Sequence, residues 1–113
     1  MVLGQIFVSR VDDITLSFAD SVTISGIGQA RDEISAAFAD GRAIVLDVDD
    51  VTETDLSFIQ LIESARRKAG ETGCGFTLRH PAAGAVLEVL QRGGFLGDDL
   101  SDRDTFWLQG AAQ

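Results

Sequence analysis

The feature of this sequence that most constrains its fold is a run of four apolar residues, AIVL at positions 43–46, which ends at Asp47. A continuous apolar run of this length indicates a central strand that is covered on both faces. The segments on either side carry apolar residues at helical spacing: residues 26–41, with Gly41 as the closing residue, and residues 57–70, with Gly70 and Gly73 marking the exit from the helix. A buried strand between two amphipathic helices requires crossover connections, and the sequence therefore predicts a sheet covered by helices.

The N-terminal part of the chain is predicted to consist of strands. Residues 5–10 and 14–20 are rich in β-forming residues, and the second segment alternates between apolar and polar residues. Together they predict a hairpin near the N-terminus. Residues 21–25 are a further candidate strand, with Asp20 and Ser21 as the turn before it.

The C-terminal half continues the alternation of strand and helix. Residues 75–80 predict a strand, and Pro81 ends it and can open the first turn of a helix over residues 82–92. The tail, residues 95–113, is acidic and then aromatic, and predicts either a last short strand or a covering segment. Residues 1–113 are thus predicted to form one α/β domain, a small sandwich with a mixed central β-sheet covered by α-helices.

The charge balance limits the class of partner. Nine basic and eighteen acidic residues give a net charge of −9, which argues against a nucleic-acid backbone or an anionic membrane surface. It favours a protein partner with a basic or mixed face. No apolar run approaches the roughly 20 residues that span a bilayer, and residues 1–13 lack the basic start of a signal peptide. We therefore expect a cytoplasmic protein without membrane insertion, monomeric or weakly dimeric.

The residue types that most often carry chemistry do not form a recognisable set. Cys74 is the single cysteine, and His80 is the single histidine and precedes a proline in a turn. The acidic residues after Asp47 lack the spacing of a calcium loop, and GIG at positions 26–28 lacks the third glycine of a dinucleotide loop. We therefore expect no catalytic residues, no metal and no cofactor.

Ser57 has the most specific alternatives. Ser57 and Gln60 have the S-x-x-Q spacing of a helix capping box, in which the serine is the N-cap. The same hydroxyl is a candidate for phosphorylation, and the two roles are compatible because a capping hydroxyl can be exposed. A phosphate would gain from the amides at the helix start, but Asp55 and the neighbouring carboxylates would repel it more strongly. Phosphorylation is thus predicted to break a contact made through this surface.

The segment from the central strand onward resembles the STAS domain family, the fold of bacterial anti-sigma-factor antagonists. Members of that family have an apolar strand that ends in Asp, a short loop, and then an Asp followed by small hydroxyl residues and Gly at the start of an amphipathic helix. Here the strand ends at Asp47, and DLSFI at positions 55–59 opens the helix. The resemblance covers residues 14–96 and implies a small α/β sandwich.

The resemblance also implies a role for Ser57, since antagonists carry at this place the serine that a partner kinase phosphorylates. It implies a phosphoprotein of bacterial signal transduction and transcription regulation, with a regulatory serine kinase or anti-sigma factor as the partner. The sequence departs from the family pattern at two positions. Leu56 stands in place of a small hydroxyl residue and Phe58 in place of Gly, and both add bulk around the hydroxyl.

Three functions remain open at this point. The leading hypothesis is a non-enzymatic switch that binds a regulatory kinase or anti-sigma factor. The second is an accessory subunit that docks on the ATPase of a membrane ABC transporter, because related domains occur on accessory proteins of lipid ABC transporters. The third is a small-molecule or nucleotide-binding module. The predicted partner-binding residues lie on the acidic loop and the helix after it: Asp49, Asp50, Glu53, Asp55, Ser57, Phe58, Gln60 and Ser64.

Overall fold

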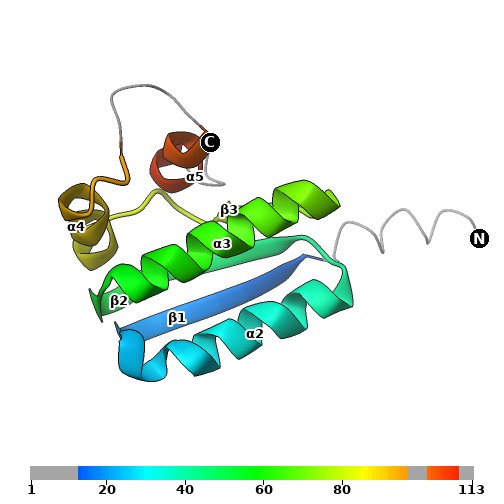
Figure 1. Ribbon diagram of the computed structural model, residues 1–113, viewed down its shortest axis with the longest axis horizontal. Coiled ribbons are helices and arrows are strands. Elements are labelled where there is room, and N and C mark those ends of the chain that lie inside the picture. Colours follow the sequence, from blue (N-terminus) through cyan, green and yellow to red (C-terminus); the bar gives the residue numbers. More distant parts are fainter. Residues whose placement is uncertain (1–12, 97–101, 110–113) are drawn as a thin grey trace, which may run out of the picture.

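The computed structural model describes residues 13–96 and 102–109 (Figure 1). Strand β2 lies between β1 and β3, and both pairs are parallel. The predicted α/β class and a sheet with helices packed on it are confirmed, and none of the described helices is long and apolar enough to cross a membrane. The elements in chain order are β1 (Ile14–Val22), the short 3-10 helix η1 (Ile24–Gly26), α2 (Ile27–Asp40), β2 (Ile44–Thr54), α3 (Leu56–Thr72), β3 (Phe76–Leu78), α4 (Gly84–Arg92) and α5 (Asp102–Gln109).

The strand β1 is longer than the sequence predicts. It continues through Asp20 and Ser21, where a turn is expected, because Asp20 adopts a left-handed φ of 60° and the register with β2 shifts on either side of it. The separate strand predicted at residues 21–25 is therefore wrong, and residues 24–26 form η1 instead. The other half of the predicted hairpin, residues 5–10, lies outside the described residues.

The central strand β2 is buried mainly on one face. Ile44 and Leu46 are fully buried, whereas Val45 and Asp47 between and after them are half-buried. Val45 lies in register with an exposed threonine on each neighbouring strand, so its own face of the sheet is polar. The prediction that this strand is covered on both faces is therefore wrong, although its central place in the sheet is confirmed.

The acidic segment after Asp47 is strand rather than loop. β2 runs to Thr54, and Asp50 and Glu53 pair with residues of β1. Val48 and Val51 remain buried along this stretch, so the apolar side of the strand continues between the carboxylates. Valine and threonine favour extended backbone, and this preference outweighs the local excess of charge. The predicted loop from Asp49 to Asp55 is therefore wrong.

Two helices end as predicted, and the start of a third is shifted. Gly41 and Gly73 follow the last turns of α2 and α3 with left-handed φ values of 78° and 75°, the conformation that favours glycine at this place. The helix α4 begins at Gly84 rather than at Pro81. The residue after the proline, Ala82, is buried and donates its backbone N–H to the carbonyl of Trp107 at 2.7 Å.

The helix α5 packs on the hydrophobic core of the molecule. The aromatic tail is therefore a covering segment and not a last strand (Figure 1). The ring of Phe106 stacks on that of Phe76, with centroids 5.7 Å apart. Trp107 is fully buried and meets Phe106 edge-on. The core has many other fully buried members, the largest being Phe58, Ile44, Leu46, Ile59, Ile62, Leu78, Leu90 and Val86.

A buried polar contact attaches α5 to α3. The indole Nε1–H of Trp107 donates to Glu63 Oε2 at 2.7 Å, and Glu63 is only 3% exposed. The guanidinium of Arg66 donates to the same carboxylate through Nη2 at 3.0 Å and Nε at 3.4 Å. A buried carboxylate is stable only when hydrogen-bonded and paired with a cation, and Glu63 therefore depends on both partners.

We expect the substitution Trp107→Phe to lower the free energy of unfolding by about 1.5–3 kcal/mol, the usual contribution of a hydrogen bond to a charged group. Urea unfolding followed by far-ultraviolet circular dichroism measures this, because the variant lacks the tryptophan that fluorescence would report. Leu108→Ala is the matched control on the same helix, since Leu108 is 39% exposed and should change stability by about 0.5 kcal/mol or less. Equal losses in the two variants would contradict a specific role for the indole N–H.

Candidate functional site

The predicted site lies where β2 passes into α3, and its central group is the Asp55 carboxylate. Oδ1 of Asp55 accepts from the backbone N–H of Ser57 at 3.0 Å and also from the Ser57 hydroxyl. Oδ2 accepts from the backbone N–H of Ile24 at 3.0 Å. One side chain therefore satisfies three donors, two of them at the start of α3 and one at the start of η1.

Asp55 is the N-cap of α3, and the capping box predicted at Ser57 and Gln60 is wrong. The backbone of Asp55 is extended, with φ −144° and ψ −175°, and the helix begins one residue later at Leu56. Ser57 is already inside the first turn, and its hydroxyl adds a bond to the capping carboxylate instead of capping the helix itself. Aspartate and serine are both preferred N-caps, and the extended backbone of β2 up to Thr54 makes Asp55 the flanking residue.

The hydrogen bonds at Asp55 favour its ionised form. The pKa of the carboxyl lies below its ordinary value of 3.8, chiefly because the Ser57 hydroxyl donates to it. Partial burial acts in the opposite direction, and the backbone N–H groups of Ile24, Ser57 and Phe58 lower the pKa further. The cap is therefore a charged group at neutral pH, placed at the positive end of the helix dipole.

The surface around this cap is unusually apolar. Ile24 is 66% exposed and Leu56 is 45% exposed. The backbone N–H of Ile24 donates to Asp55, and Leu56 directly follows Asp55 in the chain. A shallow depression of about 330 Å³ lies beside them, between the start of α3 and the end of α4. Leu56 and Gly93 both line it and lie close together, because a Cβ added on Gly93 would lie 2.8 Å from Leu56 Cδ2.

Among the other predicted residues, Phe58 is the clearest correction. It is fully buried and packs edge-on against Phe18, with ring centroids 5.3 Å apart. It therefore cannot form part of an exposed partner-binding surface, and only Leu56 adds bulk on the outside near the Ser57 hydroxyl. Residues two positions apart in a helix lie on nearly opposite sides of it, about 200° apart, and so Leu56 is exposed while Phe58 is buried.

The remaining predicted residues are exposed and lie on two elements, β2 and α3. Gln60 and Ser64 are exposed on α3, on the row that continues from Ser57. Asp50 and Glu53 are exposed on β2. Asp49 contacts His80 instead, with 2.6 Å between Oδ2 and Nδ1.

The described residues contain no group of three or more histidine, cysteine, aspartate or glutamate side chains that could hold a metal ion. His80 has Asp49 as its neighbour, and Cys74 donates weakly to the carbonyl of Arg42 at 3.3 Å. The arrangement at Asp55 can bind and release backbone and hydroxyl donors, and it can be altered by a change of charge.

Sequence reasoning missed two contacts. The first is the bond from Ile24 to Asp55, which links residues 31 positions apart. The second is the bond from Trp107 to Glu63, across 44 positions. A local signal existed for the cap, since Asp55 is a strong N-cap type directly before the helical pattern; no local signal indicates that Glu63 is buried.

Comparison with family models identifies the family of the chain. A family model described as "Mlab, STAS domain" matches residues 7–101, which is most of the chain. A search of curated proteins found no match. The matched segment contains β1 to α4, including the start of α3, and it ends before α5.

We expect Asp55→Ala to destabilise the protein at neutral pH by roughly 0.5–2 kcal/mol, the usual cost of losing an N-cap. Asp55→Asn should fall between this variant and the natural chain, because asparagine caps well but cannot accept with both side-chain atoms. Ser57→Ala should cost less than Asp55→Ala, since the cap and the backbone bond remain. Urea unfolding of the three variants ranks them, and a larger loss in Ser57→Ala would restore serine as the principal cap.

The contribution of Asp55 should also depend on pH. Because its pKa is lowered in the folded state, its stabilisation is fully present above the ordinary value of 3.8 and is lost as the pH falls through the lowered pKa. The difference in unfolding free energy between the natural chain and Asp55→Ala should therefore shrink as the pH is lowered from neutral to well below 3.8. A constant difference over this range would show that the carboxylate charge does not contribute.

Proposed function

We propose, since the chain belongs to the STAS domain family, that it is a non-enzymatic regulatory switch controlled by phosphorylation at Ser57. Its partner in this proposal is a regulatory serine kinase or anti-sigma factor. STAS domains are regulatory modules that generally interact with other proteins, and the family is generally non-enzymatic. The domain would then act by presenting or withdrawing a surface.

The observation that carries the proposal is the hydroxyl of Ser57 bonded to the capping carboxylate. Phosphorylation replaces the hydroxyl proton, which removes this bond, and adds about two negative charges beside Asp55. The same carboxylate also holds the backbone N–H of Ile24. A covalent change at this one side chain would therefore alter the hydrogen bonds at the first turn of α3 and at η1 together.

The energetic balance favours disruption. A phosphate at a helix N-terminus gains roughly 0.3–2 kcal/mol from the helix dipole. A close pair of like unit charges near a protein surface costs about 4 kcal/mol, less what salt and distance remove. The repulsion from Asp55 exceeds the gain, so the phosphate should displace the carboxylate or move away from it. Either movement changes the surface that a partner meets.

The proposed contact surface combines the predicted helix face with the apolar residues beside the cap. Gln60 and Ser64 supply polar groups on α3, and Ile24 and Leu56 supply exposed apolar area. Exposed apolar side chains grouped beside polar ones are typical of protein-binding surfaces. The net charge of −9 favours a partner with a basic or mixed face.

A second candidate is an accessory subunit that docks on the ATPase of a membrane ABC transporter through the same surface. The observation that favours it is the description of the matching family model, which is "Mlab, STAS domain". The exposed Leu56 also favours a permanent contact, because an apolar side chain next to Ser57 restricts the access of a kinase. In this case the chain would bind its partner through the same surface, and Ser57 would not be phosphorylated.

The switch predicts different outcomes for two substitutions at one position. Ser57→Asp should weaken the capture of the partner from an extract of the native cell at least tenfold, because it places a second carboxylate against Asp55. Ser57→Ala should retain most of the binding, since it adds no charge. Ser35→Asp is the matched control, because Ser35 is exposed on α2 outside the proposed surface. Circular dichroism establishes that each variant is folded.

The identity of the captured protein separates the two candidates. A kinase or anti-sigma factor supports the switch, and an ABC transporter ATPase supports the accessory subunit. Mass spectrometry of the chain from native cells, in resting and in activated conditions, tests the modification directly. Absence of phosphate at Ser57 in both conditions contradicts the switch, and equal binding by Ser57→Asp and Ser57→Ala contradicts the proposed surface.

A further inference from the structure

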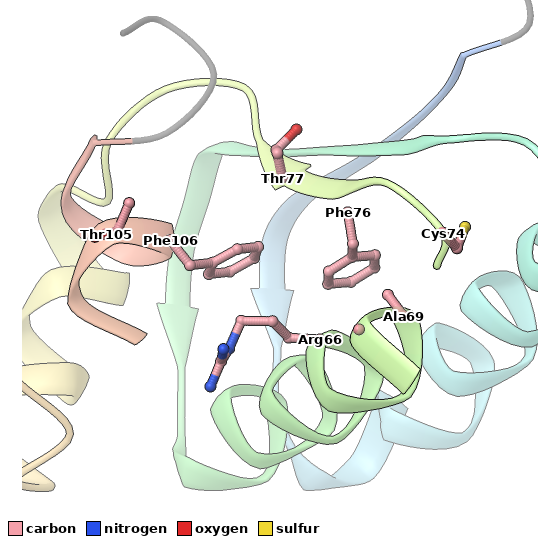
Figure 2. Close-up of a pocket in the computed structure, with 8 residues that line it drawn as sticks. Arg66, Ala69, Cys74, Phe76, Thr77, Thr105 and Phe106 are labelled. Carbon is pink, nitrogen blue, oxygen red and sulfur yellow. The ribbon is translucent and has the colours of Figure 1, made fainter. Parts of the chain in front are cut away.

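A cleft of about 350 Å³ opens between the second half of α3, strand β3 and helix α5 (Figure 2). It lies away from the start of α3, so its role does not depend on the proposed switch. The residues that matter for its chemistry are Arg66, Gly70, Phe76 and Phe106. The volume is at the lower end of the range for small-molecule sites, about 300–1,000 Å³, and is too small for a partner helix.

Aromatic rings form one wall of the cleft. Phe76 and Phe106 stack with centroids 5.7 Å apart and an interplanar angle of 5°, and Figure 2 shows the two rings side by side at the centre of the view. Phe38 continues the row on the other side of Phe76, with centroids 5.9 Å apart. Such a wall favours an apolar ligand body that can lie against the rings.

Arg66 supplies charge at the edge of this wall. Its Nε and Nη2 nitrogens donate to Glu63, while Nη1 has no hydrogen-bond partner among residues 13–96 and 102–109. A guanidinium has five N–H donors, so Arg66 can hold Glu63 and still donate to a ligand. Arginine binds carboxylates in this way with strong, directional hydrogen bonds.

Gly70 provides a second and independent argument for a binding site in the cleft. It lies inside α3, where glycine is less favourable than alanine by roughly 0.5–1 kcal/mol. Its φ is not positive, and a Cβ added there would meet no atom within 4 Å. Neither the backbone nor a close neighbour therefore requires glycine at this position. Its effect is to leave the cleft open beside the aromatic wall.

We propose that this cleft binds a small amphipathic carboxylate, with its apolar body against Phe76 and Phe106 and its carboxylate on Arg66. Glu63 does not prevent binding of an anion, because Arg66 and Trp107 already hold its charge.

Octanoate and octan-1-ol are a matched pair of probes, because they share a chain length and differ in the charged group. Titration of the full chain is followed by the emission of Trp107, the single tryptophan, which contacts Phe106. Octanoate should change the emission, raise the melting temperature and bind at least tenfold more tightly than the alcohol. Equal affinities would overturn the assignment of Arg66 as the recognition group, and no binding of either probe at millimolar concentration would overturn the site.

Paired variants locate the site. Arg66→Gln should reduce the affinity for octanoate to that for the alcohol, whereas Arg67→Gln, the same change on an exposed neighbour, should leave it unchanged. Arg66→Gln also removes one of the partners of Glu63 and can lower the stability of the fold. A second pair of variants therefore tests the cleft without changing the contacts of Glu63. Gly70→Leu should fill the cleft and lower the affinity at least tenfold without lowering the melting temperature, while Gly70→Ala should keep the affinity within about threefold. Equal affinities of the two Gly70 variants would place binding elsewhere.

Discussion

The carboxylate of Asp55 is the group that holds together the chain segments at one edge of the sheet. β1 and β2 are parallel neighbours, so the segments that follow them emerge at the same edge of the sheet. Asp55 joins those segments, because it accepts from Ile24 after β1 and from Ser57 after β2. Its charge satisfies amides that a helix start leaves without intrahelical partners. A surface built around one ionised group can be altered by changing one charge, which makes this edge suited to regulation.

Helix α3 connects this edge to the rest of the molecule. Its first turn carries the cap, its middle holds the buried Glu63, and its second half forms one side of the aromatic cleft. Trp107 and Arg66 both hold the Glu63 carboxylate, and so the position of α5 also determines where the Arg66 guanidinium lies. The helix α5 lies beyond the segment that matches the STAS family model. This helix completes the core and forms one side of the cleft.

Local signals predicted the helices better than the strands. The period of the apolar residues and the glycines at positions 41 and 73 gave helix ends that agree with α2 and α3, because these signals act within one or two turns. The strand boundaries failed at Asp20 and beyond Asp47, since pairing with a neighbouring strand extended β1 and β2 through polar residues. At the site, the sequence indicated Ser57 and Asp55 as the important pair. The capping-box pattern indicated Ser57 as the N-cap in place of Asp55, because both residue types are good N-caps and the two positions are close together.

The sequence by itself determined the class of fold, the amphipathic character of α2 and α3, the acidic surface and the place of Ser57 at a helix start. These follow from composition and from periodicity along a single segment. Only the tertiary structure decided that Asp55 also holds the N–H of Ile24, that Phe58 lies in the core and that Trp107 holds Glu63. The physical reason is distance along the chain, since the bonds concerned join residues 31 and 44 positions apart. Such contacts depend on how helices and strands pack together, and the sequence of a single segment does not predict that packing.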